Sequence, residues 1–232
     1  MSKELFEAAL AEIRNLHESS SDMSAFQQFP GSDDTEFQTY EPFHILPADH
    51  MAKDQSIRGG AFETVCKALH DLKDHALWRE TYRGTNIGED FLSRFGCFEL
   101  YGLSGHFHCE TTRGFLVYST SDLYYPWHHH PAEELYFILA GEAEFATEGN
   151  PAKLLQPGDT VFHKENQPHN MQTHGNPRKP TTSLPFHMIE HASLPNCLFS
   201  IFISIHGSTR LVRGFHCFFS RCRIAAKFVK NP

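Results

Sequence analysis

Residues 124–137 read YYPWHHHPAEELYF, and this stretch decides the fold of the chain. In a β-strand, side chains two positions apart share a face of the sheet. We therefore expect His128 and His130 to point the same way, while the intervening His129 points to the other face. Two imidazoles held on one face of a strand are half of a metal-binding site.

A turn of Pro, Ala and Glu follows the histidines, and the returning strand presents Glu134 and Tyr136 on one face. Two imidazoles and one carboxylate then meet across a hairpin. This donor set suits Fe, Mn, Co, Ni or Zn and leaves coordination positions open for a substrate. The spacing therefore predicts one divalent transition-metal ion.

A fourth ligand is expected farther along the chain. The turn at 157–159 begins a strand over 160–163, and a second turn at 164–168 then delivers His169. His163 competes for the same role, but it lies inside the strand before the turn. His169 is the preferred ligand for this reason.

The surrounding sequence changes character at Phe95. Before it, residues 3–18 and 61–79 show apolar residues at helical spacing, and 20–59 are rich in Ser, Pro and Gly and look irregular. After it, short runs of aromatic and β-branched residues alternate with turn residues, as in a sandwich or barrel. The predicted strands are 97–103, 106–111, 114–119, 124–130, 134–140, 142–147, 160–163 and 169–173.

We expect three parts: a helical extension over 1–94, a barrel carrying the metal site over 95–176, and an atypical tail over 177–232. The tail has eight basic residues and a single acidic one, and it holds three of the six cysteines. Either the runs at 198–205 and 212–219 supply closing strands, or the reading frame was lost near residue 175. We favour a lost frame, which predicts little regular pairing with the barrel.

Composition excludes several functions. The net charge of −8 argues against nucleic acid as a partner, because phosphate binding needs a basic face. The sequence has no run of apolar residues long enough to span a membrane, and Met1–Leu5 do not resemble a leader. Without C-x-x-C pairs, the cysteines are expected to be thiols in a cytoplasmic protein. A homodimer is one possible assembly.

The sequence order of these features resembles the two motifs of the cupin superfamily: His-x-His, Glu134, Gly141, a Pro-Gly turn and a Pro-His step. The resemblance implies a mainly β protein, a double-stranded β-helix or jelly-roll barrel with an α-helical N-terminal extension. It also implies the ligand set His128, His130, Glu134 and His169. The first cupin motif usually begins with Gly where this chain has Asp122. This departure puts the conformation of that turn in doubt, and not the metal site.

The added tyrosines narrow the resemblance. Tyr136 after Glu134, with Tyr125 upstream, looks like the cupin lyases that cleave dimethylsulfoniopropionate (DMSP), and the string from 127 to 141 is most similar to the DddL type. This implies a carbon-sulfur lyase acting on a sulfonium zwitterion, with Tyr136 as base and Tyr125 as its helper. Trp127 and Tyr124 are candidates to bind the sulfonium through their aromatic faces.

Three alternatives stay open on sequence alone. An iron-dependent cupin dioxygenase would use the same ligands but needs no tyrosine base. A non-catalytic small-molecule-binding cupin often loses a ligand, whereas this chain keeps all four. A metal-dependent isomerase would also use a base, and only substrate tests separate it from a lyase.

Overall fold

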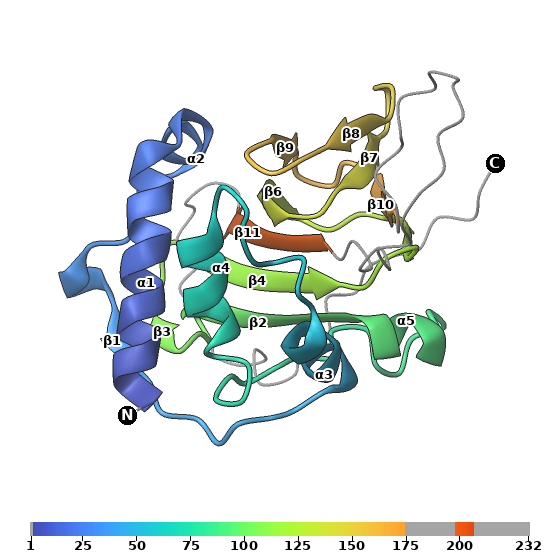
Figure 1. The fold of residues 1–232 in the computed structure, drawn as a ribbon. Helices are drawn as coiled ribbons and strands as arrows, with labels where there is room; N and C mark the ends of the chain where they lie inside the picture. Colours follow the sequence, from blue (N-terminus) through green and yellow to red (C-terminus); the bar gives the residue numbers. More distant parts are fainter. Residues whose placement is uncertain (1, 175–197, 207–232) are drawn as a thin grey trace, which may run out of the picture.

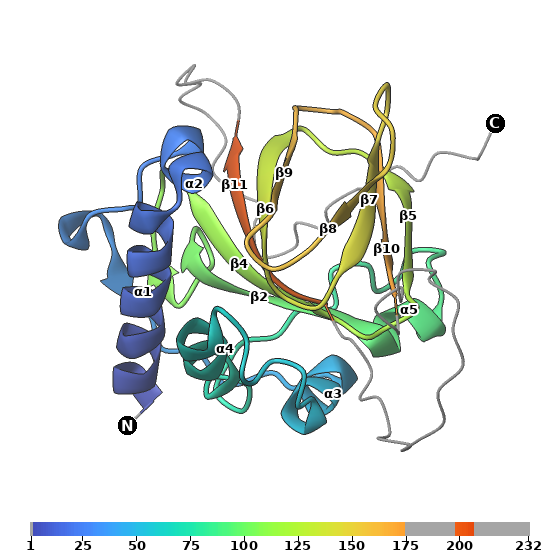
Figure 2. The same cartoon turned by 45° about the horizontal axis from the view of Figure 1, so that its top comes forward.

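The computed structural model of the chain describes residues 2–174 and 198–206. Its strands are β1 (Glu36–Phe37), β2 (Phe95–Gly102), β3 (Phe107–His108), β4 (Arg113–Ser119), β5 (Tyr124–His128), β6 (Ala132–Ala140), β7 (Ala143–Thr147), β8 (Lys153–Leu155), β9 (Thr160–His163), β10 (His169–Thr173) and β11 (Leu198–His206). They form a seven-stranded sheet, β1-β3-β2-β4-β11-β6-β9, and a four-stranded sheet, β5-β10-β7-β8. Figure 2 shows both sheets curving around one interior, which confirms the predicted barrel.

Helices cover the outer face of the seven-stranded sheet (Figure 1). They are α1 (Ser2–Ser19), α2 (Ser21–Phe26), α3 (Leu46–Lys53) and α4 (Glu63–His70), with a short 3-10 turn at Ser32–Asp34. The last helix, α5 (Glu89–Arg94), instead packs its buried residues into the barrel cluster. Apolar positions of α1 three and four residues apart are buried, because this stripe packs against the sheet and α4. None of these helices is long and apolar enough to cross a membrane.

The extension differs from the sequence prediction in two places. The second helix ends at His70 instead of residue 79, since the next residues form turns and the Trp78 indole N–H donates to the carbonyl of Lys73 at 2.8 Å. The segment 20–59 is not wholly irregular, because it contains α2 and α3. Ser20 caps α2 by accepting a hydrogen bond from the backbone N–H of Met23.

Strand β11 corrects the expectation that the tail pairs little with the barrel. It lies between β4 and β6 and pairs antiparallel with both, from Leu198 to His206. Ser200, Ile201, Phe202 and Ile203 are buried. An apolar run completes the sheet here regardless of the basic composition around it. The second run, 212–219, lies outside the described residues.

Two apolar clusters result from this architecture. One lies between the helices and the outer face of the large sheet and includes Phe6, Leu69 and Phe98. The other fills the barrel and includes Phe115, Tyr136 and Phe202, together with Phe91 of α5. The barrel interior is therefore closed at one end by the extension, and the candidate site is built inside it.

Candidate metal centre

A bulge in β5 sets the direction of the first candidate ligand, His128. Strand β10 pairs His169 with His128 and Met171 with Tyr125, so the partner strand advances two residues while β5 advances three. The extra residue lets Tyr125 and His128 face the interior together, although an odd spacing would place them on opposite faces of a regular strand. The ring of Tyr125 stacks on that of His128, with centroids 4.0 Å apart.

The predicted ligands converge inside the barrel. The side-chain donor atoms of His128, His130 and His169 lie within 4.8 Å of one another, and a second group of the same size joins His169 to Glu134 and His163. Nε2 of His130 is 2.6 Å from one carboxylate oxygen of Glu134, and Nε2 of His169 is 3.5 Å from the other. All five side chains are buried.

Backbone carbonyls fix the orientation of two candidate ligands. Nδ1 of His128 donates to the carbonyl of Pro126, and Nδ1 of His169 donates to the carbonyl of Gln167, both at 2.8 Å. A carbonyl can only accept, so the proton sits on Nδ1 and the Nε2 lone pair is left free. Such carbonyl partners are a common way to orient metal-binding imidazoles.

The electrostatics keep two of the imidazoles neutral, whereas for His130 the contact with Glu134 outweighs burial and raises the pKa. Burial lowers the pKa of His128 to about 4 and that of His169 to about 2, the neighbouring imidazoles adding to the effect, so both rings are neutral near pH 7. Burial alone would raise the pKa of Glu134, but its contacts with His130 and His163 outweigh this and hold that pKa below its usual range. The result is two neutral imidazoles facing a carboxylate.

Unsatisfied polar atoms test whether a metal fits. Among the residues that the structure describes, one oxygen of Glu134, Nε2 of His169 and both ring nitrogens of His163 are buried without a hydrogen-bond partner. Buried polar atoms normally have partners, because leaving one unpaired costs about 1–3 kcal/mol. Their convergence fits a divalent cation held by nitrogen and oxygen donors.

His163 is closer to the site than its strand position suggested. It is fully buried, its ring stacks on that of His169 at 4.0 Å, and its Nδ1 is 3.8 Å from Glu134. Unlike His169, it has no orienting carbonyl among the described residues. His169 also belongs to both donor groups, whereas His163 belongs to one.

Three buried tyrosines lie near the candidate ligands. Tyr136 and Tyr125 are both buried, and the ring of Tyr136 lies 5.8 Å from that of His163. Burial, with the charge of Glu134 adding to it, raises the pKa of Tyr136 well above its usual range. The third tyrosine, Tyr82, was missed by the sequence prediction. It comes from the extension, and its hydroxyl is hydrogen-bonded to that of Tyr125.

The two aromatic residues predicted to bind the sulfonium are placed less favourably. Tyr124 is 46% exposed and lies on the outer face of β5, opposite to Tyr125, so the structure does not bring it to the ligands. Its neighbour along the strand turns inward, and the period of two therefore turns Tyr124 outward. Trp127 is half-buried in the bulge, and its contribution stays a prediction.

The turn that precedes β5 has Asp122 in a backbone conformation that glycine usually adopts. Asp122 has a φ of 54°, in the left-handed region where glycine is usual and where Asp and Asn are tolerated better than other residues. The departure from the motif therefore changes the residue and preserves a left-handed turn.

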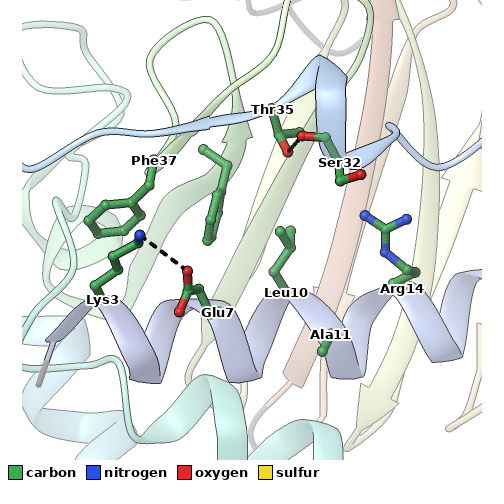
Figure 3. Close-up of a pocket in the computed structure, with 9 residues that line it drawn as sticks. Lys3, Glu7, Leu10, Ala11, Arg14, Ser32, Thr35 and Phe37 are labelled. Carbon is green, nitrogen blue, oxygen red and sulfur yellow. Dashed lines mark hydrogen bonds and ion pairs between the residues drawn. The ribbon is translucent and has the colours of Figure 1, made fainter.

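A separate surface groove of about 370 Å³ lies against α1 and contains none of these ligands (Figure 3). Lys3 and Glu7 on its wall pair with each other at 3.4 Å. The guanidinium of Arg14 stacks on Phe29 and donates to the carbonyl of Pro30. With Lys3 and Glu7 paired and Arg14 engaged in this way, the groove carries no chemistry comparable to that of the barrel.

The barrel of two curved sheets is the cupin fold, and the N-terminal helices are an extension of it. A model of the dimethylsulfoniopropionate lyase family matches residues 23–179, and the chain belongs to this family. The relatives that it matches are of the DddQ type, where the sequence resemblance suggested the DddL type.

Two comparisons support the assignment. Dimethylsulfoniopropionate lyase DddQ of Ruegeria pomeroyi is 41% identical over 172 residues, which cover 74% of this chain and 85% of that protein. Its crystal structure has a TM-score of 0.75 and covers 89% of this chain and 94% of its own. A second structure, from work on the DMSP lyases RdDddP and RnDddQII, has the same TM-score at 28% identity and covers 89% and 95% of the two chains.

Proposed function

We propose that this chain is a metal-dependent DMSP lyase that releases dimethyl sulfide and acrylate by β-elimination. The observation that carries the proposal is the converging donor set with its unpaired atoms, inside a barrel shared with DddQ. We further propose the DddQ type for this chain, since the matched relatives carry that name.

The proposed ligands are His128, His130, Glu134 and His169. Their imidazoles and single carboxylate suit Fe, Zn, Mn, Ni or Co, and the donor set alone does not select among them. When bound, such an ion would withdraw charge from the substrate carboxylate and favour the tyrosine phenolate.

Tyr136 is the proposed base, and its place two residues after Glu134 on β6 supports the role. It takes a proton from the carbon next to the substrate carboxylate. The electrons of that C–H bond form the double bond of acrylate, the C–S bond breaks, and its electron pair leaves on neutral dimethyl sulfide. The proton on Tyr136 then returns to solvent. Tyr125 is the proposed helper.

Substrate turnover without oxygen tests the proposal against the dioxygenase alternative. The metal-loaded protein is incubated with DMSP in sealed vials, with and without oxygen, and dimethyl sulfide is measured in the headspace. A lyase gives equal rates in both. A rate that depends on oxygen, or no dimethyl sulfide at all, contradicts the proposed function.

A further inference from the structure

The helical extension contributes a side chain to the interior of the barrel. Tyr82 lies between α4 and α5, is 3% exposed, and packs with Phe91, Phe95 and Tyr125, its ring centroid 5.6 Å from that of Tyr125. A phenylalanine at this place would fill the same apolar surroundings at no polar cost. A buried hydroxyl is unfavourable unless it is hydrogen-bonded, so the partners of Tyr82 define what the hydroxyl does.

One partner is the hydroxyl of Tyr125, whose ring in turn stacks on that of the candidate ligand His128. A tyrosine hydroxyl has one proton to donate and can also accept. When one hydroxyl donates to the other, the accepting hydroxyl keeps its own proton for a third group. The bond therefore restrains the position of the Tyr125 hydroxyl, whose ring lies against His128.

The segment that carries Tyr82 is held by backbone contacts. The N–H of Arg79 donates to the carbonyl of Cys97 on β2 at 2.8 Å, and the Thr85 hydroxyl donates to the carbonyl of Tyr82 at 2.7 Å. Arg83 also pairs with Glu80 and Glu89, but these pairs are exposed and contribute little. Contacts of the surrounding backbone therefore hold the segment that carries Tyr82 in place.

We propose that Tyr82 is a positioning residue of the lyase, which orients the hydroxyl of Tyr125 beside the ligand set through their hydrogen bond. The proposal rests on the proposed function. It gives the extension a part in catalysis: residues outside the barrel determine how one of the tyrosines in the site is presented.

Kinetics of hydroxyl-deleted variants test this role in the metal-loaded enzyme. Tyr82→Phe keeps the ring and should lower kcat about ten- to a hundredfold while KM stays nearly constant, because a misplaced group acts mainly on the chemical step. The double variant Tyr82→Phe/Tyr125→Phe should be no slower than Tyr125→Phe alone. Tyr101→Phe is the matched control: Tyr101 is equally buried, belongs to the outer cluster, and should keep the wild-type kcat.

Thermal unfolding supplies a readout that does not depend on activity. Each single variant of the pair should lower Tm by about 2–4 °C, as expected for one buried hydrogen bond in a chain of this size, and the double variant should lower it no further. Additive Tm losses would show that the hydroxyls are not bonded and would overturn the inference.

An active wild type with an unchanged kcat in Tyr82→Phe would also overturn the inference and leave the proposed function standing. A wild type without lyase activity would contradict the proposed function itself, and the positioning role with it, even if the two Tm losses prove coupled.

Discussion

Replacement of Phe202 by alanine tests whether the C-terminal segment belongs to the barrel. Phe202 lies on β11 and is 9% exposed; its ring stacks on Tyr136 at 5.1 Å and on Phe115 at 5.2 Å. Truncating a buried phenylalanine costs about 3–5 kcal/mol of unfolding free energy, and for a chain of this size each kcal/mol lowers Tm by about 2–4 °C. We expect Tm to fall by about 6–20 °C.

Circular dichroism during heating, or equilibrium unfolding in urea, measures this loss. Phe202→Leu keeps apolar bulk but not the stacking, and should lose about 1–3 kcal/mol, which preserves the test if the alanine variant does not fold. Leu154→Ala, 39% exposed on the edge strand β8, is the control and should change stability by less than about 0.5 kcal/mol. Phe202→Ala with the stability of the wild type would refute the placement of β11 between β4 and β6.

Three further predictions concern the site and its surroundings. Tyr136→Phe should keep the metal and Tm but lose lyase activity by about 10²–10⁴-fold, the size of a general-base effect; a variant with more than a tenth of the wild-type rate rejects Tyr136 as base. Glu134→Ala should lose most bound metal in elemental analysis, whereas His129→Ala on the same hairpin should retain it; equal metal content in the two contradicts the ligand set. Burial lowers the pKa of His106 to about 4, and its Nε2 accepts a hydrogen bond from the N–H of Leu77. An unfolded histidine binds its proton near pH 6.5. His106 should therefore leave the stability of the protein independent of pH above 6.5, and it should lower that stability as pH falls from 6.5 to 4. His106→Gln should therefore flatten the Tm profile in this window, and an unchanged slope would contradict it.

The sequence predicted that His128, His130, Glu134 and His169 converge, and their role as metal ligands stays a prediction. A period of two predicted His128 and His130 on one strand face, but β5 ends at His128, and His130 lies in the short connection to Glu134 on β6. The structure bears out this convergence. The period of two could not predict the bulge at Pro126–Trp127. A bulge is defined by the pairing with the neighbouring strand, here β10, and the sequence of β5 alone does not give that pairing.

The two other features that the sequence did not predict, the role of Tyr82 and the pairing of β11, both depend on tertiary contacts. Tyr82 lies 43 positions before Tyr125, and nothing in its local sequence distinguishes it from a core aromatic. The segment after residue 176 was judged by its charge and cysteine content, which describe composition and not pairing. Its apolar run at 198–205 was a valid strand signal, and β4 and β6 provide the two edges that such a strand completes.

Product stoichiometry tests the central claim most directly. The purified, metal-loaded chain is incubated with DMSP, and dimethyl sulfide and acrylate are followed together before and after a strong chelator is added. β-Elimination at a metal centre predicts equal molar release of the two products, a rate that falls to background with chelator, and recovery when a divalent transition metal is restored. Undiminished release in the metal-stripped protein, or dimethyl sulfide without matching acrylate, would contradict the account.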